Sequence, residues 1–138
     1  MVTSGNTVAP FPEGTGRQRP RTQGQREAEI TQRLIRFKRE RFGRGPGDIK
    51  TRIVQDMVIV RMTDALTLQE EALVQSGDVD LLKKIRARLL EAGRPELDCI
   101  LQHTTGCGIA SMYADLCPET RERVIVFVLA GTPAMTAH

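Results

Sequence analysis

Apolar residues recur with a helical period between residues 26 and 42. They fall mostly three or four positions apart, which predicts an amphipathic helix with one buried face. These residues are Ile30, Leu34, Ile35, Phe37 and Phe42. Gly43 and Pro46 end the predicted helix, because glycine readily adopts the left-handed cap conformation and proline cannot continue the hydrogen-bond ladder.

Two pairs of short apolar runs predict two strand hairpins. The predicted strands span residues 48–54, 57–62, 108–116 and 123–129. Gln55 and Asp56 form the connection in the first pair, although this turn lacks the glycine that two-residue loops prefer. Residues 117–120, which include Pro118, form the turn in the second pair.

The last predicted strand is apolar on both faces. Val124–Leu129 contains no polar residue, whereas a strand covered on one side alternates apolar and polar side chains. Met57–Val60 shows the same feature more weakly. We therefore expect the chain to complete its core by contact with other copies or a partner. The residues expected at this contact, or their opposite-face neighbours on the same strands, are Val58, Val60, Val124, Val126 and Val128.

The segment between the hairpins carries helix signals. Thr67 and Glu70 form a capping box, which predicts a short helix to about Gln75 that Gly77 closes. A longer helix follows from Asp78, with a predicted buried stripe of Leu81, Leu82, Ile85, Leu89 and Leu90. The Gly93-Arg94-Pro95 sequence interrupts this pattern, so we predict one kinked helix or two helices in near-continuation, ending at Gly106.

The resulting order is helix, strand, strand, helix, helix, strand, strand. It predicts an α+β fold in which two hairpins form a four-stranded antiparallel sheet with helices packed on one face. This single domain spans residues 26–131 and is followed by a flexible tail at 132–138. Residues 1–25 are predicted to be a disordered arm, because they hold too few apolar side chains to offset the entropy of ordering.

The net charge of +3 is unevenly distributed. Residues 1–47 carry ten Lys and Arg against four Asp and Glu, and residues 48–138 carry ten against thirteen. A basic arm is attracted to acidic lipid headgroups, nucleic acid or an acidic protein surface, and a solvated arm without a ligand is the alternative. With no Trp and a single Tyr, Tyr113, the chain lacks stacking platforms, so nucleic acid is not the expected partner.

The distribution of apolar residues also bears on location. No apolar run approaches the ~20 residues that cross a bilayer as a helix. The N-terminus lacks the hydrophobic segment of a signal peptide. We expect a cytoplasmic protein, either free or peripheral to the inner face of the membrane. Three cysteines without CxxC spacing fit reduced thiols there.

Two clusters of polar residues are candidate sites of chemistry. Cys99, His103 and Cys107 lie four residues apart, with Cys117 farther on, but they lack the paired spacing of zinc sites. A Cys99 nucleophile activated by His103 has no identifiable oxyanion site. Adjacent Glu70 and Glu71 point in different directions on a helix, so they do not form an acid–base pair. We expect no metal, no cofactor and no enzymatic activity.

The loop at residues 43–47 combines glycines with neighbouring arginines. It follows a helix and precedes a strand, whereas phosphate-binding loops precede a helix, whose N-terminus attracts anions. A helix stop and turn is therefore the favoured interpretation. The alternative is a regulatory domain that binds a small anion or nucleotide through Arg41, Arg44 and Arg94.

Six short motifs occur in a characteristic order: Arg41–Pro46, Asp56–Arg61, Leu66–Thr67, Arg94–Pro95, Thr105–Cys107 and Val126–Leu129. In order and spacing the chain resembles the MpsC-like family, formerly described as a domain of unknown function and named after a sodium-translocating, membrane-potential-generating system. The resemblance covers about residues 26–129 and brings no catalytic residues with it. It implies a soluble accessory or regulatory subunit that docks on a membrane complex for cation movement or inorganic-carbon uptake, and the doubly apolar strand adds the expectation of self-association.

Overall fold

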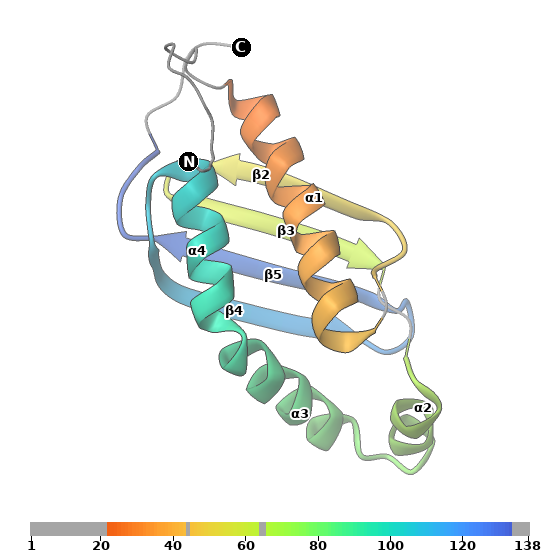
Figure 1. Ribbon diagram of the computed structural model, residues 1–138. Coiled ribbons are helices and arrows are strands. Elements are labelled where there is room, and N and C mark those ends of the chain that lie inside the picture. Colours follow the sequence, from red (N-terminus) through yellow and green to blue (C-terminus); the bar gives the residue numbers. More distant parts are fainter. Residues whose placement is uncertain (1–21, 44, 64–65, 134–138) are drawn as a thin grey trace.

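The computed structural model describes residues 22–43, 45–63 and 66–133, which form a sheet with helices on one side (Figure 1). Its elements are α1 (Gln23–Phe42), β2 (Ile49–Val54), β3 (Met57–Thr63), α2 (Leu68–Gln75), α3 (Val79–Ala92), α4 (Arg94–Thr105), β4 (Ile109–Cys117) and β5 (Glu122–Leu129). The four strands are antiparallel in the order β2-β3-β5-β4. This confirms the predicted α+β fold built from two hairpins.

Helix α1 begins earlier than the sequence pattern predicted. The Thr22 hydroxyl accepts a hydrogen bond from the Gln25 amide at 3.2 Å, and the Gln25 side chain accepts one from the Thr22 amide at 2.9 Å. This capping box starts the helix at Gln23, so residues 22–25 belong to the folded domain and not to the predicted arm. Residues 1–21 and 134–138 lie outside the described residues. Gly43 ends α1 with φ +81°, as predicted.

The two hairpins meet at the centre of the sheet. Gln55 adopts φ +57° in the first turn, so a left-handed residue other than glycine makes this connection. Strand β3 then pairs with β5 from Met57↔Val128 to Thr63↔Glu122. The doubly apolar strand is therefore an inner strand of the sheet, flanked on both sides.

The interrupted helix resolves into two separate helices, α3 and α4, which meet at Gly93. Pro95 lies in the first turn of α4, where its missing N–H costs no helical hydrogen bond. A Cβ on Gly93 would lie 2.6 Å from Cζ of Phe37, so the absence of a side chain lets α1 approach this junction. The capping box of Thr67 and Glu70 starts α2 as predicted.

The core lies between the sheet and the helices α1 and α4, which cross the same face of it (Figure 1). Along β5 the buried residues alternate with partly exposed ones. The strand residues of the core include Val58, Val60, Met62, Ile125, Phe127 and Leu129, and the helical ones include Ile30, Leu34, Phe37, Leu97 and Leu101. The predicted placement of helices on one face is thus confirmed.

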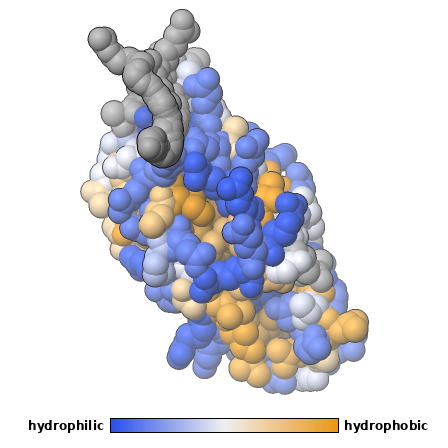
Figure 2. All heavy atoms as spheres, viewed as in Figure 1, coloured by the Kyte–Doolittle hydropathy of each residue, from blue (hydrophilic) through white to orange (hydrophobic). Residues whose placement is uncertain are grey.

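The predicted buried stripe of α3 is only partly correct. Leu82 and Leu90 are buried, but Leu81, Ile85 and Leu89 are 46%, 40% and 42% exposed. Helix α3 runs beside β4, beyond the edge of the sheet (Figure 1). Its buried residues, Leu82 and Leu90, lie on one line of the helix. The remaining apolar residues contribute to the apolar surface over α2 and α3 (Figure 2).

Candidate functional site

Three basic residues occupy inward-facing positions in the hydrophobic core pattern. Lys38 lies four residues after Leu34 on the buried face of α1 and is 8% exposed. Arg123 precedes Ile125 by two on the helix-facing side of β5 and is 6% exposed. Arg86 lies midway between buried Leu82 and Leu90 on α3. The fold thus brings cations from three separate elements inside the molecule.

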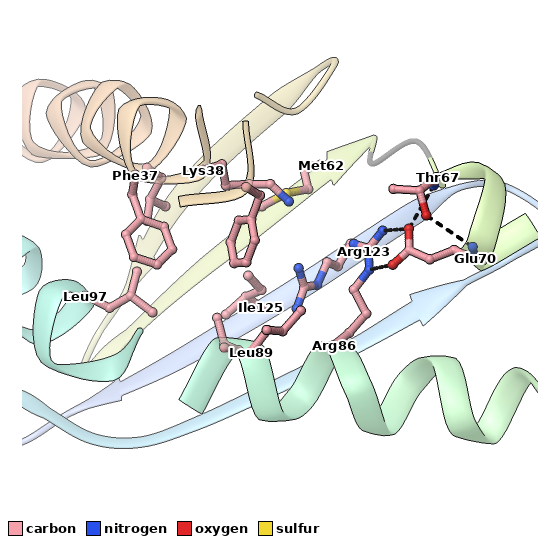
Figure 3. A pocket seen from close by; sticks show the side chains of 13 residues that line it. Phe37, Lys38, Met62, Thr67, Glu70, Arg86, Leu89, Leu97, Arg123 and Ile125 are labelled. Carbon is pink, nitrogen blue, oxygen red and sulfur yellow. Dashed lines mark hydrogen bonds and ion pairs between the residues drawn. The ribbon is translucent and has the colours of Figure 1, made fainter. Parts of the chain in front are cut away.

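These cations line one cavity of about 210 Å³ between α1, α3 and the sheet (Figure 3). The lining residues are Leu34, Phe37, Lys38, Phe42, Met62, Thr67, Glu70, Arg86, Leu89, Leu90, Leu97, Arg123 and Ile125. Most of this lining is apolar. Among the described residues that line it, the charged ones are Lys38, Arg86, Arg123 and Glu70.

Glu70 provides the carboxylate and holds one corner of the cavity together. Arg86 donates from Nε to Oε2 at 2.7 Å and from Nη2 to Oε1 at 2.9 Å. The Thr67 amide also donates to Oε1 of Glu70, at 2.9 Å. Lys38 and Arg123 reach the cavity from α1 and β5, and the Lys38 ammonium lies 5.7 Å from the centre of the Phe42 ring (Figure 3).

The arginines proposed from the sequence as an anion site are engaged elsewhere. Arg41 pairs with Glu96 and donates to the Ala92 carbonyl at 3.1 Å, which ties α1 to the junction of α3 and α4. Arg94 donates to the Ala110 carbonyl on β4 at 3.2 Å. Arg44 lies outside the described residues. Neither of the described arginines lines the cavity of Lys38, Arg86 and Arg123.

The five valines predicted at an interface divide between the two faces of the sheet. Val58 and Val60 are completely buried under the helices, so they belong to the protomer's own core and the prediction of direct contact is wrong for them. Val124, Val126 and Val128 point to the opposite face and are partly exposed. The sequence pattern does not show which valines face the helices, because both faces of β5 are apolar from Val124 to Leu129.

We call the side of the sheet away from the helices the open face. In the register of the sheet, three rows of side chains cross it. From β2 to β4 the rows are Lys50-Arg61-Val124-Asp115, Arg52-Ile59-Val126-Tyr113 and Val54-Met57-Val128-Ser111. No described helix covers this face in Figure 1. Its centre is apolar, its cations lie on β2 and β3, and its anions are Asp115 on β4 and Glu122 on β5, which pairs with Arg61.

One ion pair at the sheet edge shifts two pKa values. Lys83 Nζ of α3 lies 3.0 Å from Asp115 Oδ1 of β4. Hydrogen bonding to Lys83, supported by the Leu116 amide, lowers the pKa of Asp115. The same hydrogen bond and the charge of Asp115 raise the pKa of Lys83. Both groups are charged at neutral pH.

The polar residues considered for metal or nucleophile chemistry do not converge. Cys99 and Cys117 are exposed and Cys107 is half-buried, all as free thiols. His103 Nε2 lies 3.7 Å from a carboxylate oxygen of Glu29 on α1. Within residues 22–43, 45–63 and 66–133, no three His, Cys, Asp or Glu side chains are grouped so that they could hold a metal ion.

Comparison with known proteins identifies the family. The model described as "Na+-translocating membrane potential-generating system (MpsC)" matches residues 22–131. The chain belongs to the MpsC family. The MpsC match begins at the Thr22 cap and includes every helix and strand of the fold, which confirms the resemblance drawn from the motifs.

A curated relative is similar over most of its length. The chain is 34% identical to "Uncharacterized protein YbcI" of Bacillus subtilis (strain 168) over 112 residues, which cover 80% of this chain and 90% of that protein. No solved structure matches the chain. Among the helices that the structure describes, none is both long and apolar enough to cross a membrane.

Proposed function

We propose that this protein is a self-associating accessory component of a Na⁺-translocating, membrane-potential-generating system, and that it is not an enzyme. The family description supports the choice of system. The open face of the sheet is the observation that supports self-association. We further propose that the protein acts at the cytoplasmic side, as a regulatory subunit peripheral to a membrane complex.

The open face is complementary to a second copy of itself. A two-fold axis parallel to the strands, in the plane between two facing sheets, places β2 opposite β4 and β3 opposite β5 of the other copy. Each of the three side-chain rows then faces the same row of the other copy, running in the opposite direction from β4 to β2. Ile59 faces Val126 and Met57 faces Val128 at the centre, and burial of these apolar side chains drives association.

Charge is also complementary in this arrangement. Lys50 of one copy faces Asp115 of the other, and Arg52 faces the ring of Tyr113. Tyr113 is 62% exposed in the protomer, so its ring is available for such a contact. The alternative axis, perpendicular to the strands through the central row, would set β2 against β2, with Arg52 facing its own copy and Lys50 facing Val54. The strand-parallel axis is therefore favoured.

The size of the face sets the expected affinity. Four strands spaced ~4.8 Å apart and about seven residues long at ~3.3 Å each cover roughly 400–450 Å² on each copy. This lies at the small end of specific interfaces, where complexes are transient. The dimer should accordingly dissociate on dilution, and its mass should not depend on added metal or nucleotide.

The decisive experiment is sedimentation velocity over a concentration series. Wild-type protein should shift from monomer to dimer, and Val126→Glu should remain monomeric while keeping its circular dichroism spectrum. Ile85→Glu is the matched control, because it places the same charge on the exposed apolar surface of α3. A monomer at all concentrations, or a dimer disrupted by Ile85→Glu alone, would overturn the open-face dimer.

A mixing experiment tests the two-fold geometry itself. Lys50→Glu and Asp115→Lys each create two like-charge contacts in a homodimer, so each variant alone should associate more weakly than wild type. Mixed together they form a heterodimer in which one contact is reversed and the other is native. The mixture should therefore recover dimerisation, and failure to recover would show that these rows do not face each other.

The role in the membrane system is tested in the native cell. Deletion of the gene should lower the Na⁺-dependent membrane potential, read with a voltage-sensitive dye. Expression of the wild type should restore the potential, and Val126→Glu should not. An unchanged potential in the deletion strain would contradict the accessory role, whatever the oligomeric state.

A further inference from the structure

We infer that the outer face of α3 is a docking surface for a bilayer that contains anionic phospholipid. This inference rests on the proposed membrane association and names the part of the protein that touches the lipid. Helix α3 lies beyond the edge of the sheet (Figure 1), and its outer residues are separate from the rows of the open face. An exposed apolar stripe, the cations beside it and the fixed position of the helix carry the inference.

Helix α3 has more apolar side chains than its packing against the protein uses. Beyond the leucines that it buries, Leu81, Ile85 and Leu89 recur at every fourth position and are each 40% exposed or more. They form a second apolar stripe along the helix. An apolar surface extends over α2 and α3 in Figure 2, and Leu68, which is 86% exposed, belongs to α2. Exposed apolar surfaces mark sites that contact a membrane or another protein.

Two basic side chains border this stripe. On a helix of about 3.6 residues per turn, Lys84 and Arg88 project within about 60° of Leu81, and both are exposed. The acidic residues of α3, Asp80 and Glu91, lie farther round the helix, at about 80–100° from Leu81. Glu91 also lies 3.8 Å from a guanidinium nitrogen of α4. The charge nearest to the apolar stripe is therefore positive.

This combination is typical of a helix that lies in the plane of a membrane surface. The apolar side chains of such a helix enter the boundary between headgroups and acyl chains, while lysine and arginine beside them keep their charges among the headgroups. Anionic phospholipid attracts these cations, whereas an uncharged surface does not. The family description names a membrane system, which favours a lipid surface over a soluble protein.

The contacts of α3 with the rest of the protein hold the stripe in place. Arg86 donates two hydrogen bonds to Glu70 of α2, at 2.7 and 2.9 Å. Lys83 lies 3.0 Å from Asp115 of β4. Both contacts leave the stripe exposed. Docking therefore requires no folding of the helix on the membrane, which lowers the entropic cost of binding.

Vesicle flotation is the direct test. The full chain is mixed with vesicles of phosphatidylcholine alone, or of phosphatidylcholine with about one-third phosphatidylglycerol. Wild-type protein should bind the phosphatidylglycerol vesicles roughly tenfold or more tightly than the uncharged ones, and added salt should weaken this binding. No binding to either vesicle, or equal binding to both, would overturn the assignment.

Removal of charge assigns the binding to α3. Lys84→Gln combined with Arg88→Gln should weaken binding to the phosphatidylglycerol vesicles roughly tenfold or more and make its salt dependence shallower. Arg36→Gln combined with Arg39→Gln is the matched control, because it removes the same charge from exposed positions of α1. The control should keep most of the binding. An equal loss in the two double variants would show a general attraction of charge and overturn the docking surface.

A charge placed in the stripe tests its apolar part. Ile85→Glu should lose vesicle binding, and Val126→Glu, which places the same charge on the open face, should retain it. Circular dichroism checks that both variants are folded. Equal vesicle binding by the two variants, whether kept or lost, would overturn the role of the stripe.

The same measurements keep the lipid surface separate from the proposed function. Flotation of monomeric Val126→Glu supports the lipid surface whether or not the wild type self-associates. A wild type that dimerises but does not float overturns the lipid surface alone. Binding to native membranes that is lost after protease treatment of those membranes, without binding to pure lipid, would show a protein partner and also overturn it.

Discussion

Arg86 and Glu70 form a two-point ion pair that joins α3 to α2, with side chains only 12% and 16% exposed. The same carboxylate completes the capping box at Thr67, so a single side chain both starts α2 and fixes its position against α3. Helix α2 has no buried residue of its own. The ion pair is therefore a principal constraint on where this helix lies.

Removal of one partner of this pair should cost more than removal of both. Arg86→Met leaves the Glu70 charge nearly buried without its clamp, and we expect a loss of about 2–4 kcal/mol in the free energy of unfolding. Arg86→Met combined with Glu70→Gln removes both charges and keeps an oxygen for the cap, so it should be less destabilised than Arg86→Met alone. Urea denaturation of the wild type, Arg86→Met, Glu70→Gln and the double variant measures the coupling free energy between the two positions. If the effects of the two substitutions simply add, the residues are not a coupled pair.

The close approach of Phe37 to Gly93 predicts a steric effect. A methyl group at position 93 would meet Cζ of the buried Phe37 ring at 2.6 Å, so Gly93→Ala should destabilise the fold by about 1–3 kcal/mol. Gly24→Ala on α1 is the matched control, because nothing lies within 4 Å of its added Cβ. That variant should be neutral or slightly stabilised. Thermal unfolding compares the two, and similar effects at both positions would exclude the proposed clash.

Glu27 protects the backbone of the edge strand β2. Its carboxylate accepts hydrogen bonds from the Ile53 amide at 2.8 Å and from the side chain of Gln23 at 3.1 Å. Glu27→Ala leaves the edge amide without this acceptor, and we expect a loss of about 1–3 kcal/mol. Glu27→Gln keeps an oxygen acceptor and should lose less. Glu40→Ala, at an exposed position of the same helix, should change stability by no more than about 0.5 kcal/mol.

The pair of Lys83 and Asp115 predicts a pH dependence of stability. Because the pKa of Asp115 is lowered in the folded state, its contribution is present above the unfolded-state value of ~3.9 and is lost as the pH falls through the folded value. Because the pKa of Lys83 is raised, its contribution is present below ~10.4 and is lost as the pH rises through the folded value. The pair stabilises the fold between these limits.

Asp115→Asn and Lys83→Gln should each lower the unfolding midpoint slightly at pH 7, and the double variant should be no worse than either single variant. The differences should shrink as the pH falls below ~3.9 and through the lowered pKa of Asp115, because the carboxyl is then protonated in the folded state as well. The exposure of both side chains keeps the effect small. The measurements should use protein concentrations below the dimerisation range, so that dissociation of a dimer does not contribute to the unfolding midpoint. If the variants remain destabilised at acid pH, the charge pair is not the cause of their lower stability.

Local signals in the sequence were sufficient where a structural feature depends on neighbouring residues. Thr67 and Glu70 predicted the start of α2, and Gly43 predicted the end of α1, because caps involve only one turn of helix. The capping box of Thr22 and Gln25 is a signal of the same type, and it places the start of α1 before the residue 26 that the apolar periodicity predicted. The signal for the basic cavity was also present, since Lys38, Arg86 and Arg123 interrupt otherwise apolar positions.

The sequence by itself determined the element types, the two hairpins and a strand that is apolar on both faces. The tertiary structure decided which face each side chain occupies. Val58 and Val126 look alike in sequence, but pairing and helix placement bury the first and leave the second on the open face. It also decided that Leu82, Arg86 and Leu90 form the inward line of α3, because contact with only the edge of the sheet selects one line of side chains. Convergence of three cations depends on contacts between distant segments, and the spacing within any one segment carries no information about those contacts.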